Sequence, residues 1–121
     1  MRTAHYELRV SAFQECSVSP PESLGASSKR VGVEVSLTPL GELQVPANPY
    51  YALLIDREGN VYEATLGGCG APLSPSLPEP QQIARGWITF DLPADAHEVQ
   101  LTYAPELLGG PKEEASLQLQ L

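Results

Sequence analysis

The sequence predicts an all-β domain, a two-sheet antiparallel sandwich of about seven strands. Three observations lead to this prediction. Apolar and polar residues alternate along nearly every segment between the turns, which is the period of a strand with one face on a core and the other in water. No segment shows a helical period. The 12 prolines fall mostly between the alternating segments, as they do between the strands of all-β domains.

The first three predicted strands differ in how clearly the sequence indicates which face lies on the core. Residues 6–11 read YELRVS, and residues 31–38 read VGVEVSLT, so that apolar side chains occupy every second position. Residues 51–55 read YALLI, where Leu54 makes the run apolar on both faces. We assign the side that carries Leu53 to the core.

The fourth predicted strand, residues 61–66, follows the turn DREGN. Asp56 can accept a local backbone hydrogen bond there, and Gly59 can take the positive φ that closes a short hairpin. The acidic spacing also resembles a calcium loop, but an EF-hand loop needs glycine at its sixth position and glutamate at its twelfth. Gly59 is fourth, and Leu66-Gly67 stands where that glutamate would be, so we interpret the segment as a turn.

The last three predicted strands are residues 88–92, 98–103 and 117–121, each with strict alternation. Long connections separate the strands at residues 14–28, 67–85 and 104–114, and no repeat or linker divides the chain, so residues 1–121 form one domain. The alternation places these side chains in one core: Leu8, Val33, Val35, Leu53, Ile55, Ile88, Phe90, Leu101 and Tyr103.

The charge pattern excludes some classes of partner. The net charge is −8, from 15 acidic and 7 basic residues that are scattered along the chain. Nucleic-acid binding needs clustered Lys and Arg, and the only basic pair is Lys29-Arg30. No apolar run reaches the roughly 20 residues of a transmembrane span. No signal peptide is visible after Met1, so either the chain is cytosolic or a leader has been removed.

The two cysteines, Cys16 and Cys69, each stand at the mouth of a long loop beside a predicted strand. We predict a disulfide between them, which implies an oxidising compartment. Three alternatives remain. Cys69 could be a catalytic thiol with His5 or His97 as base, although His97 lies in the turn-like segment PADAHE and His5 opens a predicted strand. The two Cys and two His could hold zinc, but they lack the usual short spacing. Both thiols could also be free and buried.

Three stretches together resemble a known family: RVGVEVSLTPL, NPYYALLIDREGNVYEA and IARGWITFDLPADAHEVQLTYAPEL. They are similar to the telokin-like, immunoglobulin-like domain of bacterial exported proteins and lipoproteins over roughly residues 5–107. The matching positions, in chain order, are Asn48, Tyr51, Asp56, Gly59, Gly86, Phe90, Pro93, Leu101 and Tyr103. The family often has a Pro-Gly turn before Gly86, where this chain has PEPQQIAR.

The resemblance implies an immunoglobulin-like sandwich, export and, in many family members, attachment to the bacterial cell envelope through a lipidated N-terminus, an anchor that we expect to have been removed from this sequence. It implies no reaction. An antibody-type domain is not indicated, because that pattern needs a Trp between its two cysteines and Trp87 follows both.

The function that we predict is a non-catalytic, extracytoplasmic module that binds a protein, peptide or glycan, or that serves as an envelope spacer. Trp87 and Tyr50 are the candidate partner-binding residues, unless loops cover them. The alternative is an inhibitor or chaperone-like domain that inserts a loop or adds a strand to a partner, with SLQLQL as the candidate edge strand. We expect no enzymatic activity and no cofactor or metal.

Overall fold

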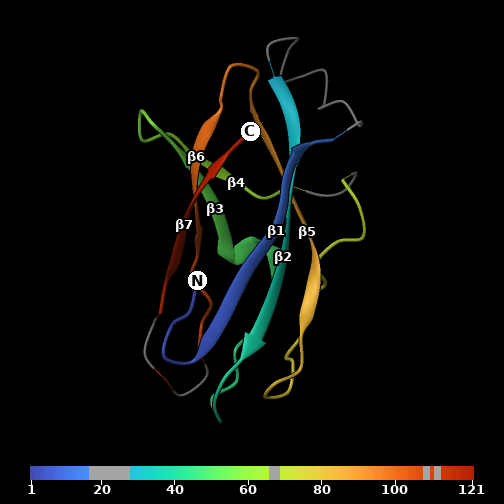
Figure 1. The fold of residues 1–121 in the computed structure, drawn as a ribbon, viewed down its shortest axis with the longest axis vertical. Helices are drawn as coiled ribbons and strands as arrows, with labels where there is room; N and C mark the ends of the chain where they lie inside the picture. Colours follow the sequence, from blue (N-terminus) through green and yellow to red (C-terminus); the bar gives the residue numbers. More distant parts are fainter. Residues whose placement is uncertain (17–27, 66–68, 108–109, 111–112) are drawn as a thin grey trace.

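The computed structural model describes residues 1–16, 28–65, 69–107, 110 and 113–121. These described residues form seven strands in two antiparallel sheets packed face to face, which confirms the predicted all-β, immunoglobulin-like sandwich (Figure 1). The strands are β1 (Tyr6–Glu15), β2 (Ser28–Pro39), β3 (Ala52–Asp56), β4 (Val61–Glu63), β5 (Ala84–Pro93), β6 (Glu98–Tyr103) and β7 (Ala115–Gln120), with a three-residue 3-10 turn, η2 (Pro49–Tyr51), before β3.

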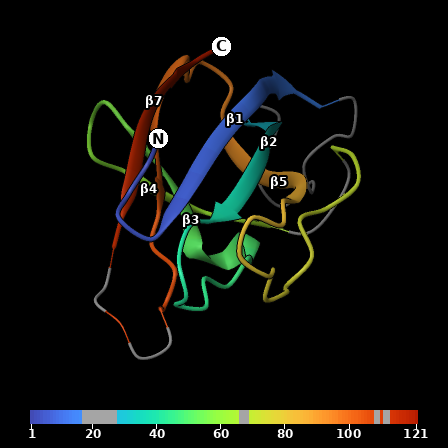
Figure 2. The same ribbon diagram turned by 60° about the horizontal axis from the view of Figure 1, so that its bottom comes forward.

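One sheet has the strand order β1-β2-β5 and the other has β4-β3-β6-β7. Seen from the turned direction, the two sheets form separate layers, with β1, β2 and β5 on one side and β3, β4 and β7 on the other (Figure 2). In an immunoglobulin constant-type domain the fourth strand belongs to the first sheet. Here β4 pairs with β3, and only after β4 does the chain cross over, where Thr65 bridges Thr89 of β5.

The core lies between the sheets and contains most of the residues that the alternation selects. These predicted core residues are buried: Leu8, Val33, Val35, Ile88, Phe90, Leu101 and Tyr103. Loop residues complete it, among them Val45, Ala47 and Leu73. The core is therefore one contiguous cluster, as expected for a single domain.

The face assigned to β3 is wrong. Ala52 and Leu54 are fully buried, whereas Leu53 and Ile55 are only half-buried and lie on the outer face. The register explains the difference, because Leu54 pairs with core residue Leu101 of β6 while Leu53 pairs with Thr102. With apolar residues on both faces of the run, the period of two could not decide which face is inside.

Several strand boundaries also differ from the prediction. β1 continues to Glu15 because a β-bulge between Val10 and Ala12 shifts its register and lets Phe13 pack against the core. β2 begins at Ser28, earlier than predicted, and β5 at Ala84. The predicted strand 61–66 ends at Glu63, and its final residue lies outside the described residues, as does most of the predicted loop 14–28.

Three tyrosines join the two sheets at the end of the sandwich where β3 begins. Tyr103 lies edge-to-face with Tyr6 and Tyr51, at ring-centroid distances of 6.2 and 6.1 Å. Its hydroxyl donates to the Pro46 carbonyl at 2.9 Å and accepts from the Asn48 amide at 3.1 Å. Burial raises the pKa of Tyr103 well above its ordinary value and that of Tyr6 to about 12, so both remain neutral donors.

Candidate interaction surfaces

The predicted disulfide is present. Cys16 lies directly after β1, Cys69 lies in the connection between β4 and β5, and their Cα atoms are 5.1 Å apart. Neither sulfur can therefore serve as a thiolate nucleophile or a zinc ligand, which removes the three alternatives for the cysteines. His5 instead contacts Glu113, with Nδ1 3.0 Å from Oε1, and His97 lies exposed in the connection between β5 and β6.

Trp87 lies on the outer face of the three-stranded sheet, opposite the buried Ile88, as the alternation predicts. Two glycines make room for it. A Cβ on Gly32 would lie 2.6 Å from the Cys69 Cβ and 2.8 Å from the Trp87 ring, and a Cβ on Gly70 would lie 2.6 Å from that ring. The loop at Cys69 and Gly70 therefore packs over the half-buried Trp87, and we call this part of the outer face the sealed face.

The next residues of the loop run along the free side of β5 and pair with it. The Trp87 amide donates to the Ala71 carbonyl at 2.9 Å, and the Leu73 amide donates to the Trp87 carbonyl at 3.0 Å. Gly86 makes this approach possible, because a Cβ there would collide with the backbone of Leu73. Leu73 is itself a buried core residue, so the loop is fixed to the sandwich at several points.

A salt bridge lies on the same outer face. Arg30 of β2 and Asp91 of β5 are cross-strand partners, with Nε–Oδ1 at 2.8 Å and Nη2–Oδ2 at 3.1 Å. The hydrogen bond that Arg30 donates to Asp91 raises the pKa of Arg30 further, so the pair stays charged. Both side chains are largely buried, which makes the pair costly to break on one side only.

A second surface lies at the end of the sandwich where β2 ends and β3 and β5 begin. Three large apolar side chains are exposed there: Tyr50 at 56%, Leu77 at 51% and Ile83 at 56%. Tyr50 comes from η2, and the other two come from the proline-rich connection before β5. We call this surface the apolar end. The structure places Trp87 on the sealed face instead, so Trp87 and Tyr50 belong to different surfaces.

Backbone hydrogen bonds hold the apolar end in place. Ala47 and Ser76 exchange two bonds of 2.9 Å, which ties the connection before η2 to the proline-rich one. The Gln81 amide donates to the Pro39 carbonyl at 3.0 Å, and Gln81 adopts a φ of +68° that is uncommon for a residue with a Cβ. Asn48 caps η2 by accepting from the Tyr50 amide at 2.9 Å. The three apolar side chains thus project from anchored loops.

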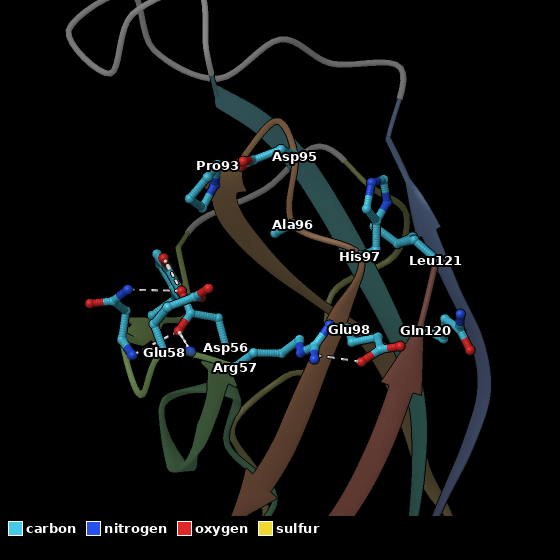
Figure 3. A pocket seen from close by; sticks show the side chains of 12 residues that line it. Asp56, Arg57, Glu58, Pro93, Asp95, Ala96, His97, Glu98, Gln120 and Leu121 are labelled. Atoms are coloured by element: carbon cyan, nitrogen blue, oxygen red, sulfur yellow. Dashed lines mark hydrogen bonds and ion pairs between the residues drawn. The ribbon is translucent and has the colours of Figure 1, made fainter.

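A third surface is an open depression of about 600 Å³ at the opposite end (Figure 3). It lies between the β3–β4 turn and the β5–β6 turn, and Asp56, Glu58, Asp95, His97 and Glu98 contribute to its lining. Arg57 reaches across to Glu98, with Nε 3.7 Å from Oε2. The depression is therefore mainly acidic and solvent-exposed.

The turn at the edge of this depression forms as predicted. The Asp56 carboxylate accepts from the amides of Glu58 and Asn60 at 3.0 and 2.8 Å, and Gly59 has a φ of +86°. It also accepts from the Asn60 side chain at 3.0 Å and the Tyr62 hydroxyl at 2.8 Å. These bonds, led by that of the Asn60 side chain, lower the pKa of Asp56. The carboxylate is thus occupied in shaping the hairpin.

Sequence reasoning did not identify one partly exposed apolar row. Leu53 and Ile55 of β3 lie on the outer face of the four-stranded sheet, beside Val61 of β4, which is 55% exposed. The run YALLI is apolar on both faces, so the sequence indicates an apolar outer face but not which side chains belong to it. Only the pairing with β6 shows which leucine points outward.

Within the described residues, no three His, Cys, Asp or Glu side chains are grouped so that they could hold a metal ion. The same part of the chain contains no helix with the length and apolar character needed to cross a membrane.

The fold and the disulfide define an immunoglobulin-like sandwich with long, anchored connections. No protein-family model matches the chain, and no curated protein matches its sequence. Solved structures share the fold. YcdA, a candidate lipoprotein of Bacillus subtilis, aligns with a TM-score of 0.81 at 13% identity over 96% of this chain. The chain spans only 36% of the YcdA structure.

Two further structures align over most of both chains. The yjhA protein of Bacillus subtilis has a TM-score of 0.62 at 17% identity, covering 87% of this chain and 76% of its own. The candidate ApaA protein of Bordetella pertussis has a TM-score of 0.55 at 21% identity, covering 97% and 95%. At these identities the similarity shows the fold.

Proposed function

We propose that this protein is a non-catalytic, extracytoplasmic interaction module of the telokin-like class, part of a bacterial cell-envelope protein, and that it binds a protein partner through the apolar end. One observation carries the binding role: Tyr50, Leu77 and Ile83 are each more than half exposed on loops that are held by backbone hydrogen bonds. Anchored aromatic and aliphatic side chains lose little conformational entropy on binding and are typical anchors of protein interfaces.

The disulfide supports the extracytoplasmic location, because such bonds persist in oxidising compartments. The fold that the chain shares with a candidate bacterial lipoprotein agrees with this location. Trp87, the other candidate anchor, has a supporting role in this proposal. It packs beneath Cys69 and Gly70 and so positions the start of the loop that carries Leu77.

A photo-cross-linking experiment in cells of the source bacterium tests the proposal. A photoreactive residue replaces Leu77, and a matched control places the same residue at Val61, which is equally exposed at the other end. We expect a discrete cross-linked species from position 77 only, on the outer side of the cytoplasmic membrane. Tyr50→Ser should reduce its yield several-fold by removing one anchor. Equal cross-linking from both positions, or cross-linking unaffected by Tyr50→Ser, would contradict the proposed surface.

The alternative function, an inhibitor or chaperone-like domain that adds a strand to a partner, is favoured by a different observation. All of SLQLQL except its last residue lies in β7, and among the described strands β7 pairs with β6 alone, which makes it an edge strand. Such an edge is the structural requirement for strand addition.

A further inference from the structure

The two sheets have four edge strands, and three of them are protected. Protection matters because an exposed edge offers unpaired backbone groups to any other strand. At β1, the N-terminal residues fold back and pair with the strand. The Met1 amine donates a hydrogen bond to the Leu8 carbonyl at 2.7 Å, and the Leu8 amide donates one to the Met1 carbonyl at 2.8 Å. Arg2 also forms a β-bridge with Glu7. The bulge after Val10 further distorts this edge.

The edges β5 and β4 are protected in other ways. Thr65 and Pro72 bridge the free side of β5, at Thr89 and Trp87. β4 is only three residues long and carries Glu63, and both features discourage pairing with another strand.

Within the described part of the chain, β7 has none of these protections. It contains six residues without a charge, a proline or a bulge. The Leu121 amide donates to the His97 carbonyl at 2.9 Å. This bond shows which residues of β7 direct their backbone groups toward β6, because hydrogen-bonded and non-hydrogen-bonded pairs alternate along an antiparallel ladder. Ser116, Gln118 and Gln120 therefore direct their backbone groups away from β6. Among the described residues, no hydrogen bond reaches these outward amides and carbonyls. We call this row the open edge.

The pattern along the open edge is complementary to itself. In an antiparallel pair centred on Gln118, Gln118 faces its own copy and Ser116 faces Gln120. Every outward backbone group then finds a partner, with about six hydrogen bonds in total. No charge faces another charge, although each chain carries a net charge of −8.

The side chains fit the same register. Leu117 and Leu119 share the inner face of β7 with the buried Ala115, and both are only half-buried. The register brings Leu117 of one chain beside Leu119 of the other, where both would lose exposed apolar area. The Gln118 amides meet on the outer face, where each can donate to and accept from the other.

We propose that the open edge is a self-association surface, through which two copies of this chain pair β7 to β7 about a twofold axis at Gln118. The two four-stranded sheets join into one continuous sheet across that axis. This dimer uses a different surface from the apolar end, so the inference stands independently of the proposed function. An edge contact is smaller than the standard interface of about 1,600 Å², so we expect a Kd on the order of 0.1 mM.

Sedimentation equilibrium of the full chain with its disulfide intact measures the association. Gln118→Pro removes an outward N–H and no bond to β6, so the monomer should fold while the Kd rises at least about tenfold. Glu63→Pro is the matched control. The Asp56 amide bonds to the Asn60 carbonyl, which directs the Glu63 amide away from β3, so proline there should leave the Kd unchanged.

A charge pair tests the twofold axis directly and does not depend on proline. Gln118→Lys and Gln118→Glu should each weaken self-association about threefold to fivefold, because like charges then face each other. An equimolar mixture should recover association, because Lys faces Glu across the axis. A defect of folding would not be rescued by mixing. Two single variants that associate as the wild type does, or a mixture without recovery, would contradict this register.

The salt dependence of association distinguishes a second copy of this chain from a basic peptide strand at the open edge. Raising NaCl from about 0.01 M to about 0.15 M shortens the Debye length from about 30 Å to about 8 Å. Two acidic copies should then associate more tightly, whereas a basic peptide strand would bind more weakly. A wild-type chain that stays monomeric at roughly 1 mM, about ten times the expected Kd, would overturn the proposal and leave the edge to a strand from another protein.

Discussion

The outer faces of the two sheets differ in what lies over them. On the three-stranded sheet, Cys69 and Gly70 pack over Trp87, and residues 71–73 pair with β5. On the four-stranded sheet, Leu53, Ile55 and Val61 form an apolar row on the surface.

Under the two proposals made above, this fold separates stability from interaction. On one face, glycines, a disulfide and a half-buried tryptophan fix a long loop against the sandwich and so hold the apolar end in position. On the other face, a short hairpin and an uncharged edge leave backbone groups and apolar side chains accessible. We expect substitutions on the sealed face to change mainly stability, and substitutions on the open edge to change mainly association.

Removal of the disulfide should have the largest effect. Cys16 and Cys69 are 53 residues apart, and a closed loop of that length stabilises by about 4 kcal/mol in the chain-entropy model. The double substitution to alanine should lower the free energy of unfolding by about that amount in urea titrations. Trp87 fluorescence should shift to the red as the loop loosens. A reduced wild-type protein is the control and should behave alike; a loss below about 1 kcal/mol would mean that the bridge does not secure the loop.

Substitutions at two adjacent leucines of β3 should have different costs in stability, because one side chain lies on the inner face of the four-stranded sheet and the other on its outer face. Leu54→Ala leaves a cavity in the core and should cost about 3 kcal/mol in the free energy of unfolding. Leu53→Ala removes a half-buried outer side chain and should cost less than about 1 kcal/mol. Equal costs in chemical denaturation would show that the face assignment from the pairing with β6 is wrong.

Gly32→Ala should test how tightly the sealed face is packed. Its new Cβ would lie 2.6 Å from the Cys69 Cβ and 2.8 Å from the Trp87 ring. Overpacking of this kind costs about 1–3 kcal/mol. Gly41→Ala, where a Cβ meets nothing within 4 Å, is the matched control and should change thermal stability little. Similar melting temperatures for the two variants would show that the sealed face can relax.

The smallest effect should appear at the turn beside the acidic depression. Hydrogen bonds hold the pKa of Asp56 below its ordinary value of 3.8 in the folded protein. The unfolded chain thus binds a proton first, and the stabilisation from Asp56, present above about pH 4, is lost as the pH falls through the lowered pKa.

Asp56→Asn should therefore flatten the decline of the melting temperature between about pH 4 and pH 2. Asp95→Asn removes a carboxylate from the same depression, one without a hydrogen bond or ion pair to any other described residue, and is the control. An unchanged acid slope in Asp56→Asn would show that this network is not formed in solution.

The sequence alone determined the class of fold, because a period of two is a local property of each strand. It was sufficient to identify the regions of all seven strands, the DREGN turn and most of the core. The disulfide could also be predicted, since two cysteines at strand ends allow one pairing. Tyr50 could be named as a candidate anchor, but its companions Leu77 and Ile83 could not, because proline-rich connections have no period from which to infer exposure.

Tertiary structure decided everything that depends on which strands are neighbours. The run YALLI is apolar on both faces, so only the register with β6 places Leu54 inside and Leu53 outside. Trp87 is half-buried because Gly32, distant in sequence, leaves space for Cys69 to lie beside it. SLQLQL has the same alternation as an interior strand, and it is an edge only because no further strand of the described chain pairs beyond it. Alternation reports which side chains share a face of a strand, whereas edges and loop contacts arise from long-range pairing that no local pattern records.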